Sequence, residues 1–482
     1  MKYFNHIPSH IVISVAQLIA KDKQKFDRSE IYVNNLVDLF YSNGDGRPWF
    51  YDRGHFIVLG QIENETGIAD FIHECGGTPT KQKVTDVLFQ LSRLAKPVPE
   101  ISTGMNLANG FLEVDAKRVD LLAHSEVHGQ RYVLPFKYNP AAQCPIWLGF
   151  LARVLPCANI LKYLQSLFGY ILLGNARPHA ECFSVWLGNG ANGKSVALYV
   201  LEYLIGHDNC SYLSLHEMTP RNTEDLVNKI VNIGSEAERG SAMQTSLVKK
   251  VVSKEPIRAE PKYRAHYSFV TPAVLVNAVN ELPAIDDRTD GIWRRMHLIK
   301  WDVTIPESER DTNLTMKLKA EMEGILNWAI EGAQRVLAEG LVVPQQIRES
   351  TKMVRLEANS TAMFCNEVIE REQNHYISKD DLYQSYGVWC KRNGYRAMSL
   401  INFAKELKRS ITEVGESKSR QGYVDWRGRS VMTRVNVWTG IHIPEDRVER
   451  EVNVSGRREV LTSAIGSQAK QAEFEIGLKL VA

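Results

Sequence analysis

One short run limits what this chain can fold into more than any other feature. The motif GxxxxGK(S/T) stands at residues 188–195, between an apolar stretch and a second stretch that favours a helix. This pattern predicts a strand over residues 183–187, a glycine-rich loop, and a helix over residues 194–205. Glycines let the backbone curl until successive N–H groups face phosphate oxygens, and the helix N-terminus adds the positive end of its dipole. The run therefore indicates an α/β fold with a phosphate-binding loop; a plain glycine turn is the alternative.

The residues expected to contact a nucleotide are those of the loop itself. Lys194 should reach the β- and γ-phosphates and Ser195 should ligate Mg²⁺, so ATP and Mg²⁺ are the expected cofactors. The predicted nucleotide-binding residues are Gly188, Asn189, Gly190, Ala191, Asn192, Gly193, Lys194 and Ser195.

A nucleotide site also needs a carboxylate for the metal ion and the attacking water. A strand is predicted over residues 229–234, and Glu236 and Glu238 follow its carboxyl end, which is where α/β sheets place ligand groups. Glu236 is the predicted carboxylate for metal and water, with Glu238 as a helper. The alternative is a pair of solvated glutamates that open a helix.

Two further polar features come later in the chain. A predicted strand over residues 269–278 is followed by Asn280, whose amide can orient water and sense the γ-phosphate; a turn before a proline is the alternative. Arg294 and Arg295 stand in the run GIWRR. Arginine is suited to charge that develops on a transferring phosphoryl group, and a neighbouring subunit often supplies it. A surface pair without this role is the alternative.

Taken in order, the glycine-rich motif, the Glu-ended strand, NELP and the run D-x-x-x-G-I-W-R-R resemble the superfamily 3 DNA helicases, in the poxvirus and phage/plasmid primase-helicase branch. Upstream, MNLANGFLEVD followed by KYNPAAQCPIW is similar to the segment that precedes the helicase core in that branch. Downstream, residues 377–410 are similar to its C-terminal winged-helix module. The resemblance spans residues 105–440 and covers residues 1–104 only weakly.

The resemblance assigns roles to the site residues. It implies that Lys194 and Ser195 bind ATP–Mg²⁺, that Glu236 is the Walker B acid, and that Asn280 is sensor 1. It also implies that the arginine finger lies in the pair at 294–295 and acts on the ATP of the next subunit.

The family further implies a homo-oligomer, a hexameric ring that moves along single-stranded DNA, typically 3′ to 5′. Residues 250–267 correspond to the hairpin that projects into the ring channel, with Lys262 and Arg264 as its expected DNA contacts. The chain departs from the family at residues 253–255, where it has Ser-Lys-Glu in place of a common Gly-Gly-Asp, and at Glu260, where a basic residue is common. These departures leave open which hairpin residue contacts DNA.

The expected fold class is an α/β P-loop ATPase core of AAA+-like, superfamily 3 type, with a mainly helical N-terminal region and a C-terminal winged-helix domain. The expected domains are residues 1–104 (mixed α/β, role unknown), 105–180 (helical segment before the core), 181–345 (ATPase), 346–440 (winged helix) and 441–482 (tail).

The expected winged-helix module is locally basic. Residues 391–440 contain many more Lys and Arg than Asp and Glu, whereas the whole chain has a formal net charge of only +2. Such a patch in a near-neutral chain is typical of a DNA-binding surface. The predicted recognition helix covers residues 399–409, with Lys405, Lys408 and Arg409 as DNA contacts, and the predicted wing covers residues 423–434. Docking on another protein is the alternative.

Composition excludes several classes of protein. With 44% hydrophobic and 24% charged residues, the chain of 482 residues is neither mainly disordered nor collagen-like. Its seven cysteines form no CxxC pair, so reduced, mostly buried thiols are expected and a zinc site of the usual spacing is not. The uncharged run at 163–176 is too short to span a membrane, and the cytoplasm of a host cell is the expected location.

The favoured interpretation is a replicative helicase of a virus or mobile element, which uses ATP to move on single-stranded DNA and to open duplex DNA at an origin. Residues 1–104 show no acidic catalytic cluster or zinc motif, so a separate primase is an expected partner. One alternative is an origin-binding initiator that uses ATP as an assembly switch; another is an RNA-directed or packaging ATPase.

Overall fold

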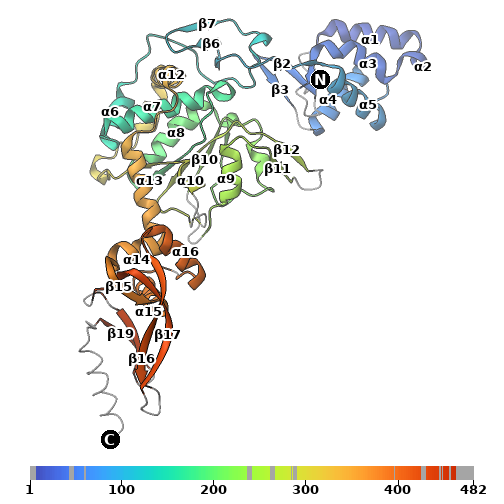
Figure 1. Cartoon of the computed structure of the whole chain (residues 1–482). Helices are drawn as coiled ribbons and strands as arrows, with labels where there is room; N and C mark the ends of the chain where they lie inside the picture. Colours follow the sequence, from blue (N-terminus) through green and yellow to red (C-terminus); the bar gives the residue numbers. More distant parts are fainter. Residues whose placement is uncertain are drawn as a thin grey trace. The chain divides into compact units, whose positions relative to one another are not determined.

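The computed structural model describes residues 7–42, 48–58, 61–235, 241–260, 266–283, 285, 290–395, 397–424, 430–444, 447, 449–454 and 457–462. The chain divides into two compact units, Met1–Ser350 and Thr351–Ala482 (Figure 1). Within the described residues, no helix is both long enough and apolar enough to cross a bilayer. The seven cysteines are free thiols and all except Cys157 are buried, as predicted.

The start of the first unit combines helices with a small sheet. Its helices are α1 (Ser9–Lys21), α2 (Lys23–Phe26), α3 (Ser29–Leu36), α4 (Gln61–Glu74) and α5 (Lys81–Leu94). Its strands β1 (Phe40–Ser42), β2 (Pro48–Asp52), β3 (His55–Ile57) and β4 (Lys96–Pro97) are ordered β3-β2-β1-β4. Helix α5 shows why such elements form: the Thr80 side chain caps its start, and Val84, Val87 and Leu91 recur at helical spacing and are buried.

A three-stranded sheet and a buried helix pair follow. Strands β5 (Gly104–Leu107), β6 (Gly110–Val114) and β7 (Val119–Leu122) are antiparallel, with the β5–β6 turn at Ala108-Asn109. The helices of the segment that precedes the core are α6 (Pro145–Val154) and α7 (Ala158–Leu172). Helix α7 packs closely on α12 (Met322–Glu339), because a Cβ on Gly169 would lie 2.0 Å from the Ala333 nitrogen. A substitution of this glycine would force the two helices apart.

The centre of the first unit is a five-stranded parallel sheet, which confirms the predicted mixed α/β class (Figure 1). Its order is β14-β8-β13-β10-β9, and every neighbouring pair is parallel. The bounds are β8 (Phe183–Leu187), β9 (Cys210–Ser211), β10 (Val231–Gly234), β13 (Val274–Val279) and β14 (Met296–Lys300). The associated helices are α8 (Lys194–Ile205), α9 (Thr245–Val252), α10 (Asp290–Trp293) and α11 (Leu314–Ala320). Strand β8 and helix α8 have the bounds that the motif predicted.

One strand prediction is wrong in extent. The strand expected over residues 269–278 is two elements, β12 (Tyr267–Phe269) and β13, because Pro272 lies between them and has no N–H for a ladder. Strand β12 pairs with β11 (Ile257–Ala259) as an antiparallel hairpin. The predicted DNA contacts Lys262 and Arg264 lie outside the described residues.

The second unit is a helical cluster on a three-stranded sheet. After α13 (Gln345–Glu357), which begins in the first unit, come α14 (Ser360–Val368), α15 (Lys379–Arg392) and α16 (Leu400–Ser410). The sheet, of order β15-β17-β16, contains β15 (Glu370–Ser378), β16 (Gly415–Val424) and β17 (Ser430–His442). Helix α16 matches the predicted recognition helix, and the β16–β17 hairpin includes the predicted wing. A further hairpin, β18 (Glu449–Val454) with β19 (Arg457–Thr462), lies where a tail was expected.

A buried histidine on β14 makes the stability of the first unit sensitive to pH. His297 Nδ1 lies 2.5 Å from the Tyr163 hydroxyl, and burial lowers the pKa of His297 from 6.5 to about 4. Between those values the unfolded chain binds more protons than the folded one, so stability falls as pH drops from 6.5 to about 4. The loss should reach about 3 kcal/mol. His297→Gln should flatten this slope in urea unfolding, whereas His73→Gln, at an exposed position, should leave it unchanged.

Candidate functional site

The glycine-rich loop leaves the carboxyl end of β8 in an unusual backbone conformation. Gly190 and Gly193 both have φ +88°, and Ala191 has φ +49°. These left-handed angles turn the chain sharply, so that α8 begins at Lys194 directly behind the loop. The N–H groups at the start of α8 have no partner within their own helix, which makes this end suited to an anion.

The segment that follows β14 holds the loop in place. The Asn192 amide donates to the Trp301 carbonyl oxygen at 3.0 Å, and the Ile305 N–H donates to the Ala191 carbonyl oxygen at 2.8 Å. Gly188 needs to be a glycine here, because a Cβ would lie 2.3 Å from the Trp301 carbonyl oxygen. The segment that follows β14 therefore holds the loop at Ala191 and Asn192.

The structure brings two predicted site residues, Lys194 and Asn280, together. Lys194 is only 5% exposed, and its ammonium donates to the Gly188 carbonyl oxygen, to Asn192 Oδ1 at 3.3 Å and to Asn280 Oδ1 at 3.2 Å. Asn280 follows β13, the strand beside β8. All three acceptors are neutral oxygens, which anionic phosphate oxygens can replace with stronger, charge-assisted hydrogen bonds.

The predicted acidic residues, Glu236 and Glu238, follow strand β10 in the sequence. Strand β10 pairs with the far side of β13, with Gly234 opposite Asn277, so its carboxyl end lies at the same edge of the sheet as the loop. Glu236 and Glu238 follow that end but lie outside the described residues, and their roles stay predictions. Ser195, the other predicted metal ligand, is exposed on the first turn of α8.

The two predicted arginines directly precede β14, at the amino-terminal end of the parallel strands, whereas the loop follows the carboxyl-terminal end of β8. The Arg295 carbonyl oxygen accepts from the N–H of Phe183, the first residue of β8, and β14 then runs parallel to β8 until Lys300 pairs with Leu187. At about 3.3 Å per residue, the strand separates the two edges by roughly 13 Å. Neither arginine can therefore serve the loop of its own chain.

The two arginines also differ sharply from each other. The side chain of Arg295 is 11% exposed and binds Glu181 at 2.6 Å, the Gly291 carbonyl oxygen at 2.7 Å and the Ser253 hydroxyl at 3.0 Å. The side chain of Arg294 is 65% exposed, and its ion pair with Glu181 is 4.0 Å long. Arg295 is built into the fold, whereas Arg294 presents its guanidinium at the surface.

An apolar cavity that no sequence pattern predicted lies beside the loop. Its volume is about 430 Å³. It is lined by Ile146, Gly149, Phe150, Arg153, Ala191, Gly193, Val196, Ile305, Glu309, Arg310, Asp311 and Leu314. Arg153 and Glu309 form an ion pair at its wall. Three segments far apart in sequence build this cavity, so no local pattern could have indicated it.

The predicted DNA contacts of α16 lie on the surface of the second unit, but two are engaged with acids. Lys408 pairs with Glu416 at 2.9 Å, and hydrogen bonds from Lys408 and Lys379 hold the pKa of Glu416 below its usual value. Arg409 pairs with the buried Glu406 at 2.6 Å. Lys405 is exposed. The surface is basic, but Glu406 and Glu416 partly neutralise its positive charge.

The loop glycines offer a matched test of how tightly the loop is packed. A Cβ on Gly193 would lie 2.8 Å from the Phe150 ring, whereas one on Gly190 would meet open space, and both residues have φ +88°. Alanine at either site should cost about 1–2 kcal/mol for its left-handed backbone. Gly193→Ala should cost a further ~1–3 kcal/mol for overpacking. Urea unfolding of the two variants measures the difference, and equal stabilities would contradict the packing.

Two family models match the chain. Residues 186–295, which include the loop and Asn280, match a family of unknown function (DUF5906), and residues 356–439 match the family "Poxvirus D5 protein-like". The second match covers the helices and the β16–β17 hairpin of the second unit.

Relatives with curated names come from large DNA viruses. The "Putative helicase L207/L206" of Acanthamoeba polyphaga mimivirus is 26% identical over 51% of this chain and 28% of its own length. The "Putative helicase 121R" of Invertebrate iridescent virus 3 is 22% identical over 57% of this chain and 33% of its own length. The chain thus spans about a third or less of these relatives. Among solved structures, the C-terminal region of NrS-1 aligns with 83% of this chain and 95% of its own length, at 12% identity and a TM-score of 0.46.

The matches converge on one group of proteins, since the D5-like model covers the second unit and the viral helicase names recur among relatives. Residues 356–439 are thus similar to the D5-like family, and about half of the chain is similar to parts of putative helicases from large DNA viruses.

Proposed function

We propose that this chain is an ATP-hydrolysing replicative DNA helicase, with a P-loop ATPase core in the first unit and a winged-helix DNA-binding module in the second. The observation that carries the proposal is the contact between Lys194 and Asn280 at the carboxyl edge of the parallel sheet. A buried ammonium beside a glycine-rich loop at a helix N-terminus is suited to a polyphosphate, and a neighbouring amide is suited to the attacking water.

Each site residue then has a role. Lys194 binds the β- and γ-phosphates, the N–H groups of residues 188–195 surround them, and Ser195 with Glu236 holds Mg²⁺. When bound, Mg²⁺ neutralises charge on the phosphates. Asn280 Oδ1, which accepts from Lys194 at 3.2 Å, turns toward the attacking water once phosphate oxygens take its place. Glu238 assists Glu236.

The cavity beside the loop is the proposed site of the adenine base. Its apolar wall contains Phe150, Val196 and Leu314, and it adjoins the loop through Ala191 and Gly193. Nucleotide bases bind in mostly apolar pockets that carry a few polar groups for orientation. Arg310 and Asp311 supply such groups at this wall.

The position of Arg294 is an argument for an assembly of several copies. Its guanidinium is exposed at the edge of the sheet opposite the loop, so we propose that it acts on the ATP of a neighbouring copy in a ring, as an arginine finger. Arg295 positions this segment through its contacts with Glu181, Gly291 and Ser253. In this proposal the ring is hexameric, moves 3′ to 5′ on single-stranded DNA, and works with a separate primase.

The decisive experiment measures ATP hydrolysis with and without single-stranded DNA, together with the mass of the assembly and the unwinding of a forked duplex. The helicase proposal expects DNA-stimulated hydrolysis by an oligomer and displacement of a strand. The basic α16 and its hairpin favour a second candidate, an origin-binding initiator, which expects tight duplex binding and little strand displacement. A monomer whose rate of ATP hydrolysis does not change with DNA would contradict both the helicase and the initiator proposal.

A further inference from the structure

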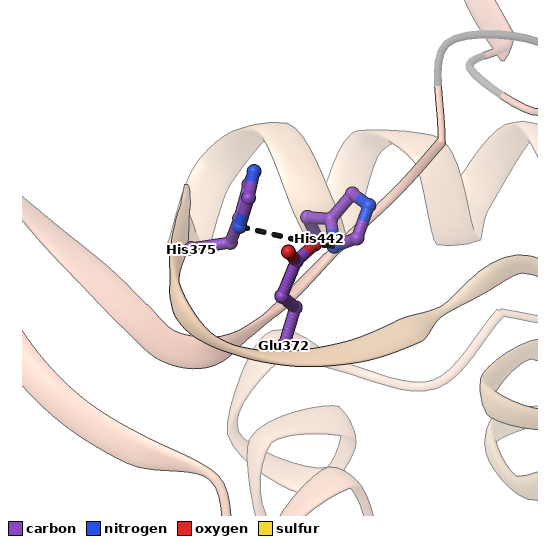
Figure 2. A group of neighbouring side chains, drawn as sticks. All are labelled: Glu372, His375 and His442. Carbon is purple, nitrogen blue, oxygen red and sulfur yellow. Dashed lines mark ion pairs between the residues drawn. The ribbon is translucent and has the colours of Figure 1, made fainter.

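Two histidines and a glutamate converge in the second unit, away from the nucleotide site. Glu372 and His375 belong to β15, and His442 ends β17 (Figure 2). His375 Nδ1 lies 3.2 Å from Glu372 Oε2, and His442 Nδ1 lies 3.8 Å from the same oxygen. One ligand atom from each of the three residues lies within 4.8 Å of the other two. The nucleotide chemistry proposed above uses none of these residues.

An irregularity in the sheet produces this convergence. Strand β15 pairs Arg371 with Ile441 and then Tyr376 with Thr439, so residues 372–375 stand opposite the single residue Gly440. Gly440 has φ +80°, a conformation that suits glycine. The bulge breaks the regular alternation of side chains between Arg371 and Tyr376. Figure 2 shows Glu372 and His375 next to His442. Bulges commonly redirect side chains at functional sites.

The spacing matches that of a tetrahedral transition-metal site. With ligand distances of about 2.0–2.2 Å, the atoms around Zn²⁺ lie roughly 3.3 Å apart. Two of the three separations in the cluster are already close to this value, and an ion at the centre would replace the histidine–glutamate pairs by direct bonds.

The remaining features also favour an ion. His442 Nδ1 is buried and has no hydrogen-bond partner among the described residues. The side chains of Glu372 and His375 are 55% and 50% exposed, so an ion can enter from solvent.

We propose that Glu372, His375 and His442 bind one Zn²⁺ ion, with a water molecule or an external ligand in the fourth position. Two imidazoles and one carboxylate suit Zn²⁺ and similar first-row ions rather than Mg²⁺ or Ca²⁺, which prefer oxygen ligands. The ion joins the bulge of β15 to the end of β17 and so fixes the edge of the sheet. In the sequence, the only signal is the short spacing Glu-x-x-His at 372–375, and the third ligand is far away at 442.

The test is a Zn²⁺ titration of the full chain after treatment with a chelator, followed by competition with a chromogenic zinc indicator. One ion should bind per chain, and a millimolar excess of Mg²⁺ should not displace it. Loss of a group that merely supports a zinc ligand costs 10–100-fold in affinity, so Glu372→Gln, His375→Gln and His442→Gln should each weaken binding at least about 100-fold. Zn²⁺ should also raise the unfolding temperature of the wild-type chain and not that of the variants.

His73→Gln and Glu413→Gln, both at exposed positions outside the cluster, are matched controls and should bind Zn²⁺ like the wild type. Glu372 and His375 are half exposed, so their variants should fold even if His442→Gln does not, and circular dichroism checks this. Three outcomes would overturn the proposal: no binding by the wild type, equal affinity in the wild type and the two exposed variants, or a bound ion that persists in the triple variant and so belongs to the thiols.

Discussion

Alanine in place of Lys194 is expected to lower the rate of ATP hydrolysis at least about a hundredfold, the usual effect of removing one preorganised donor to developing charge. Lys194 is 5% exposed and its ammonium lies beside the loop and Asn280, so the change removes the cation that is placed to bind the phosphates. Duplex unwinding, which depends on hydrolysis, should fall with it. The change removes a buried charge and adds no bulk, so the fold should persist.

Steady-state ATP hydrolysis and a forked-duplex assay measure the effect, with circular dichroism as the check on folding. Lys137→Ala removes an exposed lysine of the same unit and should leave both activities unchanged. Asn280→Ala should lower kcat more than it raises KM, because the amide is proposed to act on water rather than on nucleotide binding. A folded Lys194→Ala variant that still hydrolyses ATP at the wild-type rate would remove Lys194 from the mechanism.

The sequence was most informative where local chemistry decides the structure. The bounds of β8 and α8 follow from an apolar run, left-handed glycines and a helix start within one continuous segment, so the motif predicted them correctly. The proximity of Lys194 and Asn280 could also be expected, since both follow strands of one parallel sheet. Pro272 broke a predicted strand because one missing N–H outweighed the apolar pattern around it.

Other features depend on contacts between distant segments. Arg294 and Arg295 are adjacent and chemically identical, yet one is exposed and the other is buried against Glu181, Gly291 and Ser253. The cavity beside the loop is shared by α6, the loop and the segment after β14. The proposed metal ligands meet because a bulge redirects β15. None of these features has a periodic or local signal that a reading of the sequence could use.

The position of Arg294 leads to the second large effect. Arg294→Ala should lower ATP hydrolysis by the assembled protein at least about a hundredfold, since an arginine finger commonly contributes 10³–10⁵. Its side chain is 65% exposed and its pair with Glu181 is long, so the stability of the isolated chain should change by less than about 1 kcal/mol. Arg295→Ala should instead lower the free energy of unfolding by roughly 2 kcal/mol, because it removes hydrogen bonds from a nearly buried guanidinium.

Mixing two inactive variants distinguishes action on a neighbouring copy from action within one chain. A chain with Lys194→Ala keeps its arginine, and a chain with Arg294→Ala keeps its loop, so a mixed ring contains interfaces at which an intact loop faces an intact arginine. Random assembly of equal amounts places such a pair at about a quarter of the interfaces of a cyclic oligomer. Hydrolysis should therefore recover on mixing, to at most about that fraction of the wild-type rate. Mass measurement must show that mixed assemblies form, and if they form without any recovery, Arg294 does not act across the interface. Arg294 would then have no role in hydrolysis, because about 13 Å of sheet separates it from the loop of its own chain.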